Sequence, residues 1–190
     1  MALYLERGYD AVTVAQIAES AGLTKRTFFR HFADKREVLF AGAHAFQAAV
    51  ILAVESAADD VAPIDAVIAA LASSSGEQLA QYGQFARRRR NLIASSADLQ
   101  ERELIKMASL TAAVAAALRH RGVQALRASL TSQAAVAAFT TAYDRWVDQD
   151  GATDLPALVH QSLNELRLAI CGDAPAGEEP AVMGRPVSGG

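Results

Sequence analysis

Basic side chains gather between residues 22 and 36 of a chain that is otherwise mildly acidic. Arginine can bond the edge of a guanine base through two hydrogen bonds or clamp a phosphate, and lysine pairs with phosphate as a point charge. A net charge of −3 over 190 residues argues against a general nucleic-acid binder, but a local basic patch can still dock on phosphate. Asp34 is the one carboxylate of the stretch, and its five cations are Lys25, Arg26, Arg30, Lys35 and Arg36. These residues indicate recognition of phosphates and base edges.

Two short helices joined by a tight turn are expected to position this patch. Thr13 can cap a first helix, and Gly22 can take the left-handed conformation that ends it. Thr24 can cap the second helix, with its hydroxyl accepting from the amide of Thr27. In such a helix-turn-helix, about residues 13–32, the second helix puts its N-terminal end into the major groove of DNA. The three threonines are then placed to contact phosphate or base.

The aromatic residues of the second helix must be divided between core and surface. Phe28 and Phe32 are four residues apart and share a face, which we expect to pack inward. Phe29 points about 100° away and is expected to face DNA, the alternative being that all three rings belong to the core. His31 either donates to a phosphate or packs, and the sequence leaves both open.

The run from residue 13 to 40, TVAQIAESAGLTKRTFFRHFADKREVLF, resembles the DNA-binding domain of the tetracycline-repressor (TetR) family. That family has a threonine-capped helix, an Ile-Ala-x-x-Ala-Gly turn and a Thr-aromatic-Tyr-x-His-Phe helix. Phe29 stands where the family usually has tyrosine, so a hydroxyl contact to phosphate is lost, while stacking or contact with a thymine methyl is retained. The chain also begins inside the family's first helix, and we therefore expect a truncated or misassigned start.

The resemblance implies a function and a set of contacts. The protein would be a homodimeric, cytoplasmic regulator, most commonly a repressor, that leaves a palindromic operator when a small molecule binds its C-terminal helices. The alternative is a degenerate helical protein that binds a ligand or partner but not DNA. The operator contacts implied by the match are Lys25, Arg26, Thr27, Phe29, Arg30, His31 and Lys35.

The whole chain is expected to be all-α, because alanine dominates its apolar residues and no alternation long enough for a strand is visible. We expect a DNA-binding domain at 1–40 with three helices, an effector-binding and dimerisation domain at 41–171, and a disordered tail at 172–190. A helix capped by Asp34 should reach about residue 57, and the sequence SSSG at 73–76 should be a loop. The remaining helices are expected at about 63–72, 77–94, 99–119, 129–148 and 155–170.

Two apolar seams near the C-terminus predict a dimer interface of four helices, two from each copy. Two-fold pairing would also double the readout of a palindromic site. The alternative is that both seams belong to the core of one chain. The residues of the seams are Val136, Phe139, Tyr143 and Trp146, then Val159, Leu163, Leu166 and Ile170.

The middle of the chain is expected to hold the effector, an unknown small molecule that is either apolar or of acyl type. Four consecutive arginines at 87–90 point around a helix rather than to one side, so pairing with carboxylates such as Glu101 and Glu103 is expected. The alternative is that one arginine faces a pocket for an anionic ligand such as an acyl-coenzyme A. Candidate pocket residues, which could equally be ordinary core, are Phe85, Leu104, Met107, Leu110 and Val114.

Other classes of function find little support in the sequence. The chain has no convergent nucleophile, histidine and acid, no di-iron carboxylate pattern and no phosphate-binding glycine loop, so neither an enzyme nor a cofactor is expected. One cysteine, Cys171, excludes an internal disulfide and a cysteine metal cluster, and the scattered histidines disfavour a metal site. We expect no membrane contact, because no uncharged apolar run approaches 18 residues.

Overall fold

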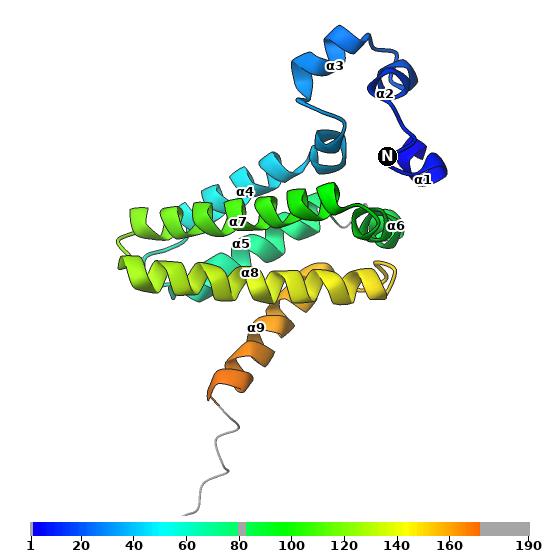
Figure 1. The fold of residues 1–190 in the computed structure, drawn as a ribbon. Helices are drawn as coiled ribbons and strands as arrows, with labels where there is room; N and C mark the ends of the chain where they lie inside the picture. Colours follow the sequence, from blue (N-terminus) through cyan, green and yellow to red (C-terminus); the bar gives the residue numbers. More distant parts are fainter. Residues whose placement is uncertain (1, 80–82, 172–190) are drawn as a thin grey trace, which may run out of the picture.

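The described part of the chain, residues 2–79 and 83–171 of a computed structural model, consists of helices and their connections (Figure 1). The all-α prediction is confirmed over these residues, whereas the predicted disordered tail lies outside them. The elements are α1 Ala2–Arg7, α2 Val14–Ser20, α3 Lys25–His31, the 3-10 helix η1 Arg36–Phe40, α4 Ala43–Glu55, α5 Pro63–Gln78, α6 Gly83–Ala94, α7 Ala97–His120, α8 Ala125–Asp148 and α9 Leu155–Cys171.

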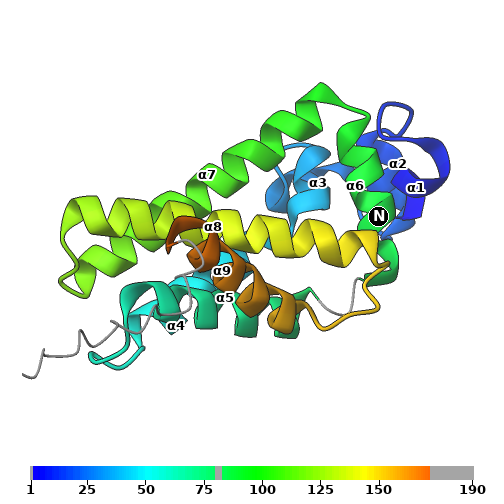
Figure 2. The same cartoon turned by 90° about the horizontal axis from the view of Figure 1, so that it is seen from below.

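A main core lies among α4, α5, α7, α8 and α9. α8 packs against α7 and α9, while α5 packs against α4, α8 and α9. Val50, Leu71, Leu118 and Trp146 are almost completely buried there. The indole N–H of Trp146 donates to the carbonyl of Thr153 at 3.0 Å, so its polar atom is satisfied as well. This core supports the smaller group of helices α1 to α3, which lies at one end of it (Figures 1 and 2).

A second core joins the two groups of helices. It combines buried Tyr4, Tyr9 and Phe40 from the N-terminal segment with Leu92 and Ile93 of α6. The hydroxyl of Tyr4 donates to the carbonyl of Lys35 at 2.6 Å, and burial raises the pKa of Tyr4. We refer to this cluster as the junction core; it fixes the DNA-binding segment to α6 through apolar contact.

The predicted loop at 73–76 was wrong, because α5 continues through it to Gln78. The buried Ser75 donates its hydroxyl to the carbonyl of Ala72 at 2.8 Å, so the serine is satisfied without leaving the helix. Gly76 within this helix leaves room for the close approach of α9. A Cβ atom at Gly76 would lie 2.9 Å from Cγ of Pro156.

The helix expected from Asp34 to residue 57 is instead two elements. Asp34 does cap its beginning, since Oδ1 accepts from the amides of Arg36 at 2.8 Å and Glu37 at 3.2 Å. The segment is a 3-10 helix as far as Phe40, and α4 starts only after Gly42. Leu39 and Phe40, at the end of this 3-10 helix, are both buried in the junction core.

The structure corrects the predicted dimer interface. Five of its eight residues are buried against helices of the same chain, so they are not available to a partner: Val136, Phe139, Trp146, Val159 and Leu163. Tyr143 and Leu166 are half-buried, and Ile170 is 73% exposed. The apolar periodicity identified the buried face of each helix, but α8 and α9 pack with these faces against each other and against α5 and α7 of the same protomer.

Candidate nucleic-acid interface

The turn between α2 and α3 has the predicted geometry. Thr13 and Gln16 form a reciprocal cap, with the Gln16 amide donating to the Thr13 hydroxyl at 3.3 Å and the Thr13 amide donating to Gln16 Oε1 at 2.9 Å. Gly22 has a φ of +67° and donates to the carbonyl of Glu19 at 3.0 Å. Glycine adopts this left-handed conformation without the steric cost that a side chain adds, so the chain can turn directly into α3.

The start of α3 is capped as predicted. Thr24 accepts from the amide of Thr27 at 3.2 Å, and the two hydroxyl oxygens lie 3.0 Å apart. The cap orients the first turn of α3 but also occupies these hydroxyl groups. Their contact with phosphate or base, like that of exposed Thr13, stays a prediction.

The rings of α3 divide between core and surface as expected. Phe28 is 1% exposed and its ring lies 5.3 Å from that of Phe32, while Phe29 is 55% exposed. The rings of Phe28 and Phe29 are arranged edge to face, with their centroids 5.5 Å apart. An exposed aromatic ring held by a buried neighbour is well placed to lie against a base.

The cations of α3 are exposed beside that ring. Lys25, Arg26, Arg30 and His31 are all exposed, and the Arg30 guanidinium lies 3.4 Å from Nε2 of His31. In the described part of the chain, neither Lys25 nor Arg26 has a hydrogen-bond or ion-pair partner. α3 thus presents positive charge and an aromatic surface that the rest of the protomer leaves free.

Lys35, expected at a backbone phosphate, has a structural role in the free protein. Its ammonium donates to the carbonyls of Tyr9 at 2.9 Å and Val12 at 3.1 Å, and lies 4.3 Å from the centre of the Tyr9 ring. Arg36 is likewise bonded to the carboxylate of Asp34, at 2.8 Å from its Nε. Lys35 thus ties the end of the helix-turn-helix to the loop after α1, whereas Arg36 makes a local pair. A phosphate contact by Lys35 stays a prediction.

Three of the four arginines in the run on α6 are paired with carboxylates, as the first of the two interpretations predicted, and Glu103 is one of the two carboxylates that it named. Arg87 bonds Asp150 at 2.8 Å, Arg89 bonds Glu103 at 3.0 Å and Arg90 bonds Asp148 at 2.6 Å. Burial lowers the pKa of Arg89, but Glu103 and Tyr143 together outweigh it and the net shift is upward. Arg89 therefore stays charged inside the protein, and the run is a set of structural cations.

The predicted effector residues do not all surround one cavity. Met107 and Leu110 line a recess of about 160 Å³ between α4 and α7, whereas Val114 is fully buried in the main core. Leu104 is 71% exposed and Phe85 is 37% exposed, and neither lines this recess. Residues that the sequence reasoning missed complete it, notably His44, Gln47, Arg102 and Lys106. The four-residue spacing of Arg102 and Lys106 indicates a shared helix face, but nothing in the sequence places α4 opposite that face.

Comparison with known proteins agrees with this geometry. A family described as bacterial regulatory proteins, tetR family, matches residues 1–41. A second, described as the MftR C-terminal domain, matches residues 61–170, which is more than half of the chain. The protein belongs to the TetR family. It therefore carries the helix-turn-helix domain of a family of bacterial regulatory proteins, and the predicted recognition is confirmed.

Individual relatives of this TetR-family protein are similar in part. It is 47% identical over 53 residues to the HTH-type transcriptional regulator TcmR of Streptomyces glaucescens, a match that covers 28% of this chain and 24% of that protein. The matched part thus spans about a quarter of the relative's length. The crystal structure of the TetR-family regulator PfmR from Thermus thermophilus has 21% sequence identity and a TM-score of 0.46, with 86% of this chain and 91% of that chain covered.

One stretch of the TetR-family protein, Arg36–Glu55, is long and apolar enough to cross a membrane when judged by length and composition. A core helix of a soluble protein meets the same criterion. Here the stretch is interrupted between η1 and α4, and it supplies Phe46, Val50 and Val54 to the main core. It is a weak indication of a membrane span, and the expected lack of membrane contact stays a prediction.

Proposed function

We propose that this TetR-family protein is a cytoplasmic repressor that binds a palindromic operator as a homodimer and releases it when a small molecule enters its helical body. The observation that carries the DNA side of the proposal is the exposed, unpaired charge of Lys25 and Arg26 next to the exposed ring of Phe29. Arg30, His31, Thr13, Thr24, Thr27 and Lys35 are proposed as further contacts. In this proposal residues 1–40 read DNA and residues 41–171 bind the effector and the second copy.

The homodimer is supported by the family and by the logic of the site. One helix of seven residues contacts few base pairs, and two copies on a palindrome double the readout. The second copy would pack on surfaces of α8 and α9 that are not already buried in the protomer, where Ile170 is exposed and Leu166 half-buried. The five core residues of the predicted seams are not part of this proposed interface.

Release of the operator would follow from a population shift. DNA binding requires the two copies of α3 at the spacing of successive major grooves. A ligand that binds more tightly to an arrangement with a different spacing lowers the population that fits DNA. The recess between α4 and α7 is a candidate site for the ligand, because α4 follows directly from η1 and the helix-turn-helix.

The test is fluorescence anisotropy with duplexes from the DNA flanking the regulator's own gene, over a series of salt concentrations. We expect the logarithm of the association constant to fall steeply with the logarithm of salt concentration, since phosphate contacts release counterions. Arg26→Ala combined with Arg30→Ala should abolish tight binding. Arg88→Ala with Arg119→Ala removes the same charge from exposed positions on α6 and α7 and serves as the control.

Two results would contradict the proposal. One is a salt dependence near zero for a folded protein, which would exclude phosphate contacts as the source of affinity. The other is an equal loss of binding in the control pair, which would show that net charge, rather than α3, determines the affinity.

A further inference from the structure

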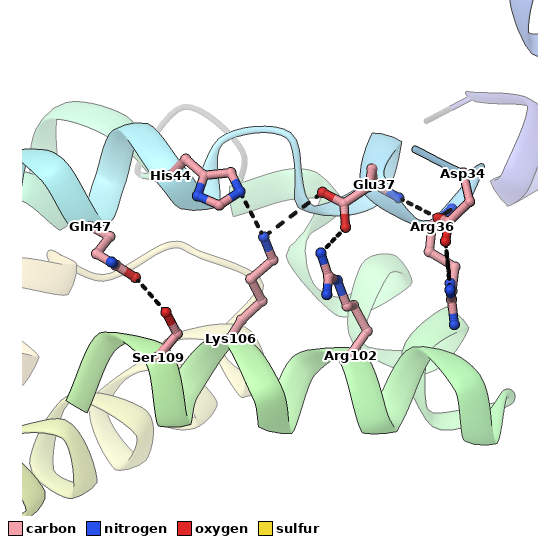
Figure 3. A network of polar contacts seen from close by, with 8 residues as sticks. All are labelled: Asp34, Arg36, Glu37, His44, Gln47, Arg102, Lys106 and Ser109. Carbon is pink, nitrogen blue, oxygen red and sulfur yellow. Dashed lines mark hydrogen bonds and ion pairs between the residues drawn. The ribbon is translucent and has the colours of Figure 1, made fainter. Parts of the chain in front are cut away.

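The recess between α4 and α7 has a charged end and an apolar wall. Arg102 and Lys106 lie one helical turn apart on α7 and face Glu37 of η1 and His44 of α4 (Figure 3). Arg102 donates to Oε1 of Glu37, and the ammonium of Lys106 lies 3.9 Å from its Oε2. Two cations therefore share one carboxylate.

Lys106 is the most constrained member of this group. It is 9% exposed, and its ammonium has three donors, yet the nearest acceptor in the described part of the chain is Nε2 of His44 at 3.3 Å. The Nε atom of Arg102 is also buried and has no hydrogen-bond partner among the described residues. Buried charges and donors are normally paired, so an entering carboxylate that reaches both cations can compete with Glu37 for them.

The remainder of the recess is apolar. Phe46 from α4 and Ile105, Met107 and Leu110 from α7 contribute to its lining, and its volume is about 160 Å³. A cavity of about 150 Å³ lined by aliphatic and aromatic side chains accommodates a benzene-sized group. The apolar part of a ligand is therefore limited to roughly one ring or a short branched chain. At the far end, the hydroxyl of Ser109 donates to Oε1 of Gln47 at 3.2 Å.

We propose that the recess binds a small carboxylate carrying one compact apolar group, and that its carboxylate takes the place of Glu37 on Arg102 and Lys106. The apolar group would lie against Phe46 and Leu110. This inference deepens the proposed ligand response and rests on it for the regulatory step, although binding itself does not require that the regulator bind DNA.

Displacement of Glu37 would connect the ligand to the DNA-binding segment. Glu37 lies in η1, and its amide donates to the carboxylate of Asp34. Only two residues separate Asp34 from the end of α3. The contact between Glu37 and α7 is thus a polar link from the exit of the helix-turn-helix to the body. A ligand that removes this link favours arrangements in which η1 and α3 are free to change position relative to α7, and these bind the operator less tightly.

The probe is benzoate, compared with benzamide, which has a similar shape and no charge. Isothermal titration calorimetry of the full chain should show benzoate binding at millimolar concentrations or below, and benzamide binding at least about tenfold weaker. Lys106→Met and Arg102→Gln should each lower benzoate affinity about tenfold or more, whereas Arg88→Gln, an exposed arginine on α6, should leave it unchanged.

Glu37→Gln provides the decisive variant, because it removes the competing carboxylate without touching the cations. We expect it to bind benzoate several-fold more tightly than the unaltered protein. This measurement tests the site even if the separate variant Lys106→Met does not fold. Absence of benzoate binding, equal binding of benzoate and benzamide, or weaker benzoate binding by Glu37→Gln would each overturn the inference.

DNA binding is measured separately, so that the two proposals can fail independently. Saturating benzoate should weaken binding to the DNA flanking the gene, and Glu37→Gln should bind that DNA more weakly than the unaltered protein without any ligand. Tight DNA binding without benzoate binding overturns this inference and leaves the proposed repressor intact. Benzoate binding by a protein that does not bind DNA supports the site and contradicts the proposed function.

Discussion

Two short helices of this regulator, α3 and α6, each carry a cluster of basic residues, and they use these residues in opposite ways. On α3, Lys25 and Arg26 are exposed, without partners among the described residues. On α6, Arg87, Arg89 and Arg90 each bond a carboxylate. The α6 run is the denser of the two, yet α3 is the one that remains available to an external anion.

The difference arises from what surrounds each helix. α6 lies against α7 and α8, which present Glu103 and Asp148 to it. α3 packs against α2, and the nearest carboxylate in sequence, Asp34, is already bonded to Arg36. Whether a basic cluster is free to bind an external anion therefore depends less on its density in the sequence than on whether the folded chain places carboxylates next to it.

The largest expected effect tests this contrast on DNA affinity. Arg26→Ala with Arg30→Ala should weaken operator binding by about 2–6 kcal/mol, since each base or phosphate contact by arginine is worth about 1–3 kcal/mol. Arg87→Ala with Arg90→Ala, which removes the same charge from α6, should change the affinity by less than about 0.5 kcal/mol. Anisotropy titrations at fixed salt measure both. Similar losses for the two pairs would remove the functional distinction between the helices.

A second prediction concerns the stability of the folded protein. Arg89→Ala should lower the free energy of unfolding by about 2 kcal/mol, because it leaves the half-buried carboxylate of Glu103 without its partner. The exposed neighbour, Arg88, provides the control, and Arg88→Ala should cost less than about 0.5 kcal/mol. Urea unfolding followed by circular dichroism gives both values, and equal stabilities of the two variants would show that the α6 cations are not structural.

Thr24→Ala tests how α3 is held in place. Loss of the cap should lower the free energy of unfolding by about 1 kcal/mol. Thr24→Ser keeps a hydroxyl that can accept from Thr27 and should retain most of that stability. If the serine and alanine variants unfold at the same urea concentration, the cap does not stabilise α3 in solution.

The smallest effect is a dependence on pH at the exit of α3. The bond from the Arg36 side chain holds the pKa of Asp34 below its ordinary 3.8, so the pair stabilises the fold fully above that value and progressively less as the pH falls below it. Both side chains are more than a third exposed, so we expect the effect to be below about 1 kcal/mol. Carboxyl chemical shifts followed by NMR should place the midpoint of Asp34 below 3.8, and a midpoint above it would mean that the pair does not form in solution.

The local features of the DNA-binding segment could be predicted because their signals lie close together in sequence. The caps at Thr13 and Thr24 and the turn at Gly22 each depend on residues three or four positions apart. Helical geometry alone predicts that Phe28 and Phe29 lie on different faces of the helix. In the same way, the apolar period found which face of α8 is buried, with Trp146 as its largest member.

Features that depend on distant residues could not be predicted. Glu37 and Arg102 are 65 positions apart, and His44 and Lys106 are 62 positions apart. No spacing pattern in the sequence predicts contacts over such separations. A periodic seam shows that a face is covered but not whether its cover belongs to the same chain, and for this reason five residues of the protomer core were predicted to lie in the dimer interface. The need for a residue without a side chain at Gly76 likewise depends on the approach of Pro156 from α9.

The junction core sets a limit on how this regulator can be recombined. The DNA-binding segment contributes Tyr4, Tyr9 and Phe40, but Leu92 and Ile93 that cover them belong to α6. The DNA-binding segment therefore does not contain a complete hydrophobic core of its own. A chimaera can join residues 2–40 to the C-terminal domain of another regulator. It will keep the fold and the sequence preference of this segment only if that domain has apolar side chains at the position that α6 occupies here.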